Sequence, residues 1–172
     1  MITANNYIII KVILLLLILP FSLNTVAKDN FSIYLVRHAE KQAEEKNPKL
    51  TQCGVFRAKQ LAALLEETNI EKIYSTSYQR TMQTARPLAN SKALSVKHYN
   101  PKHLPEFALR IKQQKNNSLI VGHSNTTPLL VELLTGKKVN KIVESNYQML
   151  YQVQFIEEHV LLTIFKQPLK CK

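Results

Sequence analysis

Residues 33–41 read IYLVRHAEK, and this stretch decides the fold expected of the 172-residue chain. An apolar run rich in branched side chains that stops abruptly at Arg37 and His38 is typical of a strand buried on both faces. Ligands of open α/β sheets collect at the carboxyl ends of such strands. At that position Arg37 can hold an anion, and His38 can attack the anion or bind it.

Two later segments repeat this design. Residues 119–123 read LIVGH, a second apolar run that ends in His123, and the short run 73–75 is soon followed by Arg80. Two arginines and two histidines at three strand exits therefore predict one shared pocket. Because a guanidinium donates hydrogen bonds in pairs to phosphate oxygens, a phosphoryl group is the natural occupant.

The rest of the chain alternates strand and helix patterns. Strands are expected over residues 31–37, 70–75, 93–99, 119–122, 147–155 and 160–165, and helices over 51–67, 78–89, 105–114 and 128–136. Thr51 and Ser77 are candidate N-caps, Pro105 suits a first helical position, and Gly136 suits a helix end. This order predicts a three-layer α/β sandwich whose central sheet is mostly parallel, with an antiparallel hairpin at one end.

The formal net charge of +11 raises the question of a nucleic-acid partner. The basic residues are scattered rather than grouped, and no nucleic-acid motif accompanies them. A positive field that attracts a small anionic phosphorylated substrate explains the charge equally well. We therefore expect such a substrate and no nucleic acid.

Residues 1–27 differ from the remainder. They contain no acidic residue, place Lys11 before an apolar block that Pro20 closes, and end in small residues. These are the features of a secretory signal peptide, which predicts an exported protein, periplasmic or secreted, with a single domain over 28–172. An uncleaved membrane anchor is the alternative. Export would permit Cys53 and Cys171, the only two cysteines, to oxidise, but their spacing leaves open whether they pair.

The residues at the predicted pocket suit attack on phosphorus. A neutral imidazole is a competent nucleophile, and nearby arginines disfavour its protonated form. His38 is the better candidate nucleophile because it directly follows Arg37, and a backbone carbonyl that accepts from its second nitrogen would fix the tautomer. His123 would stabilise transition-state charge, and the amides of Ser124 and Asn125 could add donors.

Three segments in the same order carry a family resemblance: residues 35–41 (LVRHAEK), 73–85 (IYSTSYQRTMQTA) and 121–126 (VGHSNT). They resemble the Arg-His-Gly, second-arginine and second-histidine segments of the histidine phosphatase superfamily, which has the phosphoglycerate-mutase-like fold. The resemblance implies attack by His38, a phosphohistidine intermediate and hydrolysis by water. It places Arg37, Arg80 and His123 around the phosphate, and it implies no metal and no cofactor. The short chain also resembles the small phosphohistidine phosphatases of this superfamily.

The chain departs from the family pattern at two points. Ala39 stands where the family has glycine, and it would be strained if the backbone needed a positive φ. Larger members place the leaving-group acid between the second arginine and the second histidine, where Glu106 is the only acidic residue here. Glu106 is therefore the candidate proton donor and Glu40 its rival.

These observations predict a phosphatase that hydrolyses a phosphomonoester or a phosphohistidine. A non-catalytic phosphate-binding protein on the same fold and a mutase-type phosphotransferase are the alternatives. The loops 41–49 and 99–105 are expected to line the mouth of the pocket and to select the substrate.

Overall fold

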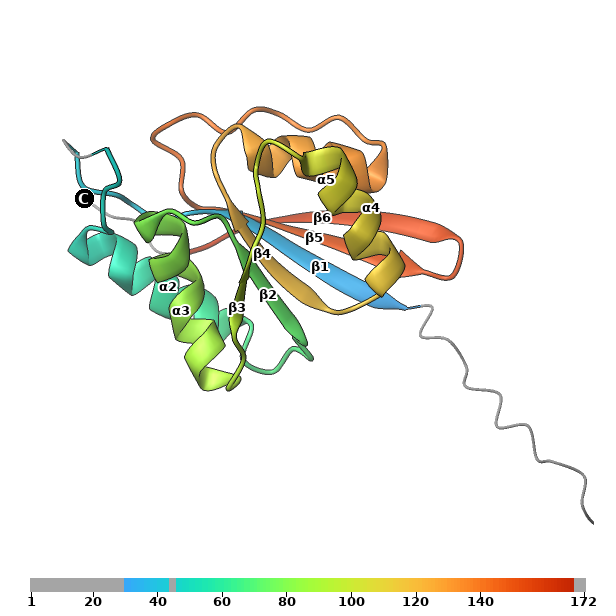
Figure 1. Cartoon of the computed structure of the whole chain (residues 1–172), viewed down its shortest axis with the longest axis horizontal. Coiled ribbons are helices and arrows are strands. Elements are labelled where there is room, and N and C mark those ends of the chain that lie inside the picture. Colours follow the sequence, from blue (N-terminus) through green and yellow to red (C-terminus); the bar gives the residue numbers. More distant parts are fainter. Residues whose placement is uncertain (1–29, 44–45, 169–172) are drawn as a thin grey trace, which may run out of the picture.

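A computed structural model describes residues 30–43 and 46–168 of the chain. The predicted leader, residues 1–27, lies outside the described residues. Six strands form one sheet in the order β3-β2-β4-β1-β5-β6 (Figure 1). The strands are β1 (Phe31–Arg37), β2 (Lys72–Ser75), β3 (Val96–His98), β4 (Ser118–Gly122), β5 (Met149–Ile156) and β6 (His159–Lys166).

The centre of the sheet is parallel and one end is antiparallel. β1 pairs in parallel with β4, β4 with β2, and β2 with β3. β5 runs antiparallel to β1 and continues into β6 as a hairpin, which leaves β6 as an edge strand with Leu161, Ile164 and Phe165 exposed. The predicted α/β sandwich with a terminal hairpin is confirmed.

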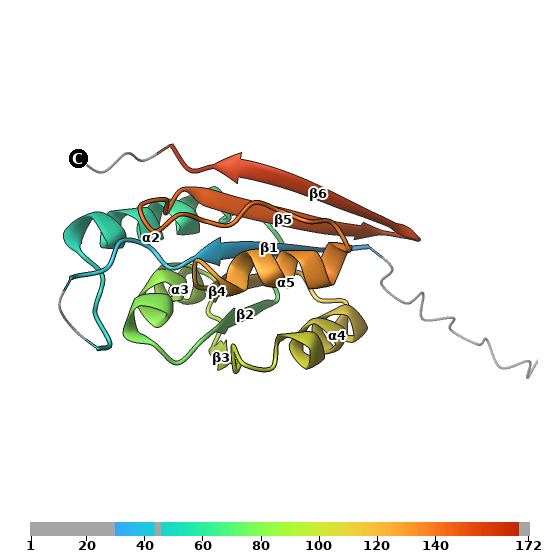
Figure 2. The same ribbon diagram turned by 90° about the horizontal axis from the view of Figure 1, so that it is seen from above.

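In the part of the chain that the structure describes, four helices cover the two faces of the sheet. Figure 2 shows them beside the strands in a second view. They are α2 (Gln52–Leu64), α3 (Gln79–Ser91), α4 (Leu104–Gln114) and α5 (Thr126–Thr135). α2 and α3 bury Leu61 and Leu88 against one face, whereas α4 and α5 bury Ile111 and Leu130 against the other. Because β4 lies between these layers, all five of its residues are buried, as a central parallel strand requires.

Local signals explain where most of the helices begin and end. The Thr51 side chain accepts a hydrogen bond from the Gly54 amide at 3.1 Å, which confirms the predicted N-cap of α2. Pro105 lies in the first turn of α4, and Gly136 ends α5 with a φ of 71°.

Several predicted boundaries were wrong. The strands predicted from 70, 93 and 147 begin at Lys72, Val96 and Met149, and the helix predicted from 128 begins at Thr126. α2 ends at Leu64 rather than near residue 67, because a turn follows Leu65. The N-cap of α3 is Tyr78 and not Ser77, whose hydroxyl instead lies 3.3 Å from His98 Nδ1. At Ser77 a tertiary contact overrides the local preference for helix capping.

The connections after β1 and β4 open a crevice between these neighbouring strands. The chain leaves β1 towards α2, on one face of the sheet, and leaves β4 towards α5, on the opposite face (Figure 1). Such a divergence at the carboxyl ends of adjacent parallel strands is where ligands bind in doubly wound sheets. The fold therefore provides a concave site next to Arg37 and Gly122 before any side chain is considered.

Among the described residues, no helix is long and apolar enough to cross a bilayer. Cys53, in the first turn of α2, is disulfide-bonded. Cys171, the second cysteine of the sequence, lies outside the described residues.

Candidate active site

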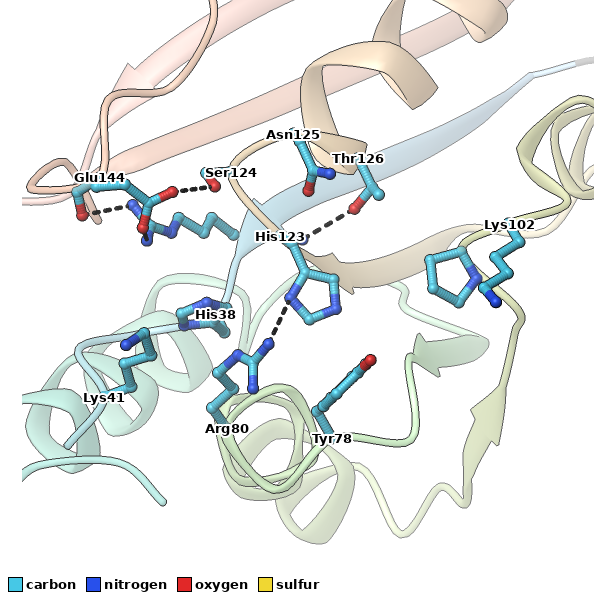
Figure 3. A pocket seen from close by; sticks show the side chains of 12 residues that line it. His38, Lys41, Tyr78, Arg80, Lys102, His123, Ser124, Asn125, Thr126 and Glu144 are labelled. Atoms are coloured by element: carbon cyan, nitrogen blue, oxygen red, sulfur yellow. Dashed lines mark hydrogen bonds and ion pairs between the residues drawn. The ribbon is translucent and has the colours of Figure 1, made fainter. Parts of the chain in front are cut away.

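A cavity of about 600 Å³ opens at the carboxyl ends of β1 and β4 (Figure 3). The structure brings five predicted site residues to its wall: Arg37, His38, Arg80, His123 and Ser124. The imidazole centroids of His38 and His123 lie 5.6 Å apart, edge to face. The residues that the sequence placed at three separate strand exits therefore meet at a single pocket.

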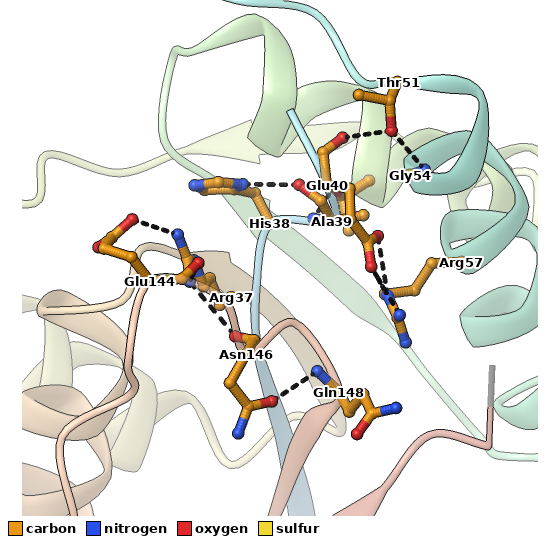
Figure 4. Close-up of polar contacts among 11 residues, drawn as sticks. Arg37, His38, Ala39, Glu40, Thr51, Gly54, Arg57, Glu144, Asn146 and Gln148 are labelled. Atoms are coloured by element: carbon orange, nitrogen blue, oxygen red, sulfur yellow. Dashed lines mark hydrogen bonds and ion pairs between the residues drawn. The ribbon is translucent and has the colours of Figure 1, made fainter. Parts of the chain in front are cut away.

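His38 is held by backbone groups on both sides. Its amide donates to the Gly122 carbonyl at 3.0 Å, which fastens the end of β1 to the end of β4. Its ring Nδ1 lies 2.8 Å from the Ala39 carbonyl oxygen (Figure 4). Because a carbonyl only accepts, Nδ1 carries the proton, and the lone pair of Nε2 remains for a ligand.

Ala39 fits its position without backbone strain. The residues with a positive φ in the described chain, glycine aside, are Ala93, Lys115 and Glu157, so Ala39 has an ordinary φ. Its side chain is fully buried, and its amide donates to the Thr84 hydroxyl at 3.0 Å. The replacement of the family glycine by alanine therefore leaves the conformation next to His38 intact.

Arg37 is anchored along one edge of its guanidinium. Nη1 donates to the carbonyl oxygens of Val143 at 3.1 Å, Glu144 at 2.7 Å and Asn146 at 3.3 Å. Nη2 donates to the Glu144 carboxylate at 2.6 Å (Figure 4). The centroid of the Tyr147 ring lies 4.2 Å from the guanidinium carbon. Nε is buried and has no hydrogen-bond partner.

Arg80 has a parallel environment on the other side of the pocket. Its guanidinium carbon lies 4.5 Å from the centroid of the Tyr78 ring, and Nη2 lies 3.4 Å from His123 Nδ1. Its Nε is also buried without a partner. Because an unpaired buried donor is unfavourable, two such donors at one cavity indicate a site for an anion.

His123 is oriented by its two ring contacts. Arg80 can only donate, so His123 Nδ1 is the acceptor in that contact. Nε2 then carries the proton and donates to the Thr76 hydroxyl at 2.9 Å. The His123 amide also donates to the Thr126 hydroxyl at 3.0 Å, which fixes the turn between β4 and α5.

Both histidines are held in the neutral form. Burial, which is the largest cause, and the charges of Arg37 and Arg80 together lower the pKa of His38 to about 3, although the hydrogen bond with Ala39 raises it. Burial and the same two arginines lower the pKa of His123 to about 4. At neutral pH the pocket therefore combines two cationic guanidinium groups with two uncharged imidazoles.

Neither predicted acid reaches the pocket. Glu106 lies exposed in the first turn of α4, and it does not line the cavity. The Glu40 carboxylate is paired with Arg57, whose Nε lies 2.9 Å from both carboxylate oxygens and whose Nη2 lies 2.6 Å from one of them. The placement of the proton donor at Glu106 or Glu40 is thus corrected by the geometry.

Several residues at the site were missed by the sequence analysis. Glu144 is the one carboxylate among the described residues that line the cavity, and Tyr78 lines it as well. Lys102, which belongs to the predicted mouth loop 99–105, also lines it. Tyr147 was included in the strand predicted over 147–155, yet it lies before β5 and packs on Arg37. No periodic pattern marks these positions, because they stand in loops. Lys41, from the loop expected at the mouth, does line the cavity.

The described residues contain no group of three or more His, Cys, Asp or Glu side chains arranged to hold a metal ion.

The family model of the "Histidine phosphatase superfamily (branch 1)" matches residues 33–108, a range that includes Arg37, His38 and Arg80. No curated protein matches the chain by sequence. Among solved structures, the chain is similar to the α-ribazole phosphatase from Shigella flexneri, with a TM-score of 0.64 and 16% identity, over 79% of this chain and 96% of that one.

Two further solved structures share the fold. The protein histidine phosphatase SixA, solved with tungstate, has a TM-score of 0.64 and 13% identity, over 80% of this chain and 97% of that one. A mycobacterial glucosyl-3-phosphoglycerate phosphatase has a TM-score of 0.61 and 12% identity, over 80% of this chain and 98% of that one. The match to the family model over residues 33–108 and the shared fold agree with the resemblance to the histidine phosphatase superfamily that the three motifs predicted.

Proposed function

We propose that this protein is a phosphatase that transfers the phosphoryl group of its substrate to His38 and then to water. The observation that carries the proposal is the arrangement of donors around the nucleophile. Arg37 and Arg80 both border the cavity and both keep a buried Nε without a partner. A phosphoryl group would supply oxygen acceptors to these donors next to the free Nε2 of His38.

The lone pair of His38 Nε2 forms a bond to phosphorus, and the bond from phosphorus to the leaving atom breaks. The leaving atom keeps the electron pair of that bond and takes a proton from solvent. Arg37, Arg80 and the helix-terminal amides near Ser124 stabilise the charge on the equatorial oxygens. A water molecule then attacks the phosphohistidine, so that inorganic phosphate leaves and Nε2 recovers its lone pair.

The absence of a suitably placed acid favours a good leaving group. Glu144 is the one carboxylate lining the cavity among the described residues, and it is already engaged by Arg37 and Ser124. A phosphoramidate bond, as in phosphohistidine, needs less acid assistance than an alkyl ester because its nitrogen is easily protonated. We therefore place phosphohistidine before alkyl phosphates in the order of expected substrates, in line with the similarity to SixA.

The leaving group has room beside the phosphoryl pocket. A second cavity of about 660 Å³ shares Tyr78, Pro101 and Lys102 with the first, and it is also lined by Lys46 and His98. Lys46, Pro101 and Lys102 come from the two loops expected at the mouth, 41–49 and 99–105, whereas Tyr78 and His98 do not. A leaving group that carries acidic groups would meet Lys46 and Lys102 there.

Phosphate release tests the proposal. Purified protein should hydrolyse p-nitrophenyl phosphate in a chelator-treated buffer without added metal, and it should hydrolyse a phosphohistidine peptide faster than the matching phosphoserine peptide. Rapid quenching should trap an acid-labile, base-stable phosphoenzyme that His38→Ala lacks. Undiminished turnover by His38→Ala would exclude the mechanism, and phosphate binding without turnover of any substrate would indicate a non-catalytic binding protein.

We further propose that the predicted leader exports the enzyme. The support is the charge and hydropathy pattern of residues 1–27. N-terminal sequencing of the protein made in a cell with intact secretion should find a chain that begins near residue 28. A protein that retains residue 1 in the membrane fraction would instead support an anchor.

A further inference from the structure

The Glu144 carboxylate occupies the position that an anionic ligand would be expected to take. Its Oε2 accepts from Arg37 Nη2 at 2.6 Å, and its Oε1 accepts from the Ser124 hydroxyl at 2.5 Å (Figure 3). Two oxygens of one anion thus bridge two groups at the rim of the cavity. Two oxygens of a phosphoryl group could make the same pair of contacts.

We propose that Glu144 is an internal competitor of the substrate: its carboxylate fills part of the phosphoryl site in the free enzyme, leaves when substrate binds, and returns to displace product phosphate. This inference rests on the proposed phosphoryl pocket and adds a step to its cycle. Glu144 is a positioning residue in this scheme, since it acts through Arg37 and Ser124.

The exposure of the two partners makes the exchange feasible. The Arg37 side chain is 2% exposed, whereas the Glu144 side chain is 75% exposed. The carboxylate can therefore rotate into solvent without opening the core. Its own charge is then surrounded by water and is not buried without a partner. An exposed carboxylate that leaves its partner is promptly hydrated, so the cost of its departure is moderate.

Arg37 stays in place when the carboxylate leaves. Its Nη1 is held by the backbone carbonyls of Val143, Glu144 and Asn146, and these contacts do not depend on the side chain at position 144. The opposite edge of the guanidinium, Nη2 and Nε, then becomes available as a pair. Nε already lacks a partner, so release of Nη2 completes the two-donor edge that suits phosphate.

The charge state of Glu144 supports its role as a competitor. The hydrogen bond from Ser124 lowers the pKa of the Glu144 carboxyl group, and the charge of Arg37 and the hydrogen bond from it lower the pKa further. The group is therefore an anion at neutral pH. Its return to Arg37 after hydrolysis would weaken the hold on product phosphate, which otherwise faces two guanidinium groups.

The decisive experiment compares Glu144→Gln with the wild-type enzyme. Glutamine keeps the size of the side chain and removes the charge, so it competes poorly for Arg37. Inorganic phosphate, titrated by calorimetry, should bind Glu144→Gln about tenfold more tightly than the wild type, the effect of one charge-assisted contact. The inhibition constant of phosphate should fall by the same factor. The kcat of Glu144→Gln should either stay constant or fall by less than tenfold.

A matched control removes the same charge elsewhere. Glu158 lies exposed in the turn between β5 and β6, so Glu158→Gln changes the net charge equally without touching the cavity. Its phosphate affinity should equal that of the wild type. A tenfold gain in both variants would indicate a general electrostatic effect and would overturn the proposal.

Other outcomes also decide the question. Unchanged or weaker phosphate binding by Glu144→Gln would overturn the proposal. So would a loss of kcat confined to substrates with poor leaving groups, at constant phosphate affinity, because that would assign Glu144 as the leaving-group acid. The ratio of the phosphate affinities of Glu144→Gln and the wild type is measured without turnover. If the wild type is inactive and this ratio is tenfold, only the proposed phosphatase activity is rejected. If the wild type is active and the ratio is one, only the proposed role of Glu144 as a competitor is rejected.

Discussion

Arg37 and Arg57 are both buried arginines that pair with a glutamate, yet the two pairs differ in their surroundings. Arg57 contacts Glu40 through Nε and Nη2, and the Glu40 side chain is 15% exposed. Arg37 contacts Glu144 through Nη2 alone, and the Glu144 side chain is 75% exposed. Both arginine side chains are almost fully buried, at 2% and 3% exposed.

The difference separates a structural ion pair from a binding group. In the Arg57 pair the two-donor edge is already used by a carboxylate that has little access to water. In the Arg37 pair half of that edge is unused and the acid can leave. Whether a buried arginine is structural or binds a ligand is thus better inferred from the donor edge that remains available than from its burial or from the presence of an acid.

The largest expected effect is on activity. Arg37→Ala should lower kcat/KM by about a hundredfold or more, because it removes a donor from the transition state. Arg57→Ala should lower kcat/KM by less than about tenfold in protein that is still folded, since Arg57 does not line the cavity. Steady-state kinetics with p-nitrophenyl phosphate measure both. Equal losses would erase the distinction between the two pairs.

The second effect is a pH dependence of stability that arises in the pocket. His38 and His123 have folded pKa values of about 3 and about 4, below the ordinary value of 6.5. Between the folded values and the ordinary value the unfolded chain binds more protons than the folded chain. The free energy of unfolding should therefore fall as pH drops, by about 3 kcal/mol for the two histidines together from pH 6.5 to pH 5. Urea titrations measure this slope.

A double variant checks the source of that slope. His38→Gln with His123→Gln removes both titrating rings, and its free energy of unfolding should vary much less over the same pH range. A slope as steep as that of the wild type would assign the effect to other groups.

The third effect is the loss of stability when the glutamate of each ion pair is replaced by glutamine. Glu40→Gln should lower the free energy of unfolding by about 1.5 kcal/mol, because it leaves the buried Arg57 without its counter-charge. Glu144→Gln should change the free energy by less than about 0.5 kcal/mol, because the side chain is exposed. Thermal and urea unfolding would show the difference, and a larger loss in Glu144→Gln would mean that the two acids have been assigned the wrong way round.

The smallest effect concerns the leaving group. Lys102→Ala should raise KM about threefold for a substrate with an acidic leaving group and should leave KM for p-nitrophenyl phosphate almost unchanged. Lys72, whose strand enters the sheet far from its carboxyl edge, offers a control of equal charge as Lys72→Ala. A uniform rise in KM for both substrates would place Lys102 at the phosphoryl group instead.

The sequence predicted the parts of the site that strands carry. Arg37 and His38 follow a buried run, His123 follows another, and parallel strands bring their carboxyl ends to one edge. The hairpin at 149–166 was predictable for a similar reason, because its alternation has the period of a strand. Periodicity determines these positions without knowledge of any distant contact.

The site residues in loops and at helix starts could not be predicted from the sequence pattern. Glu106 was chosen for its place between two motifs, but α4 buries Leu104, Phe107 and Ile111 and turns Glu106 towards solvent. Glu144 follows no apolar repeat, and only the path of the loop before β5 brings it to Arg37. Tyr147 fitted the strand alternation, yet the strand begins two residues later.

In the crevice at the carboxyl ends of β1 and β4, regular secondary structure and connecting loops have different roles. Groups that would hold the phosphoryl moiety stand at the ends of β1 and β4 and at the start of α3, whereas Lys41, Lys102 and Glu144 stand in connecting loops. Exchange of the loops by grafting should therefore alter which compounds are accepted, and how fast product departs, while the nucleophile remains in place. A library randomised at 41, 102 and 144 offers a compact starting point for retargeting this scaffold to new phosphorylated compounds.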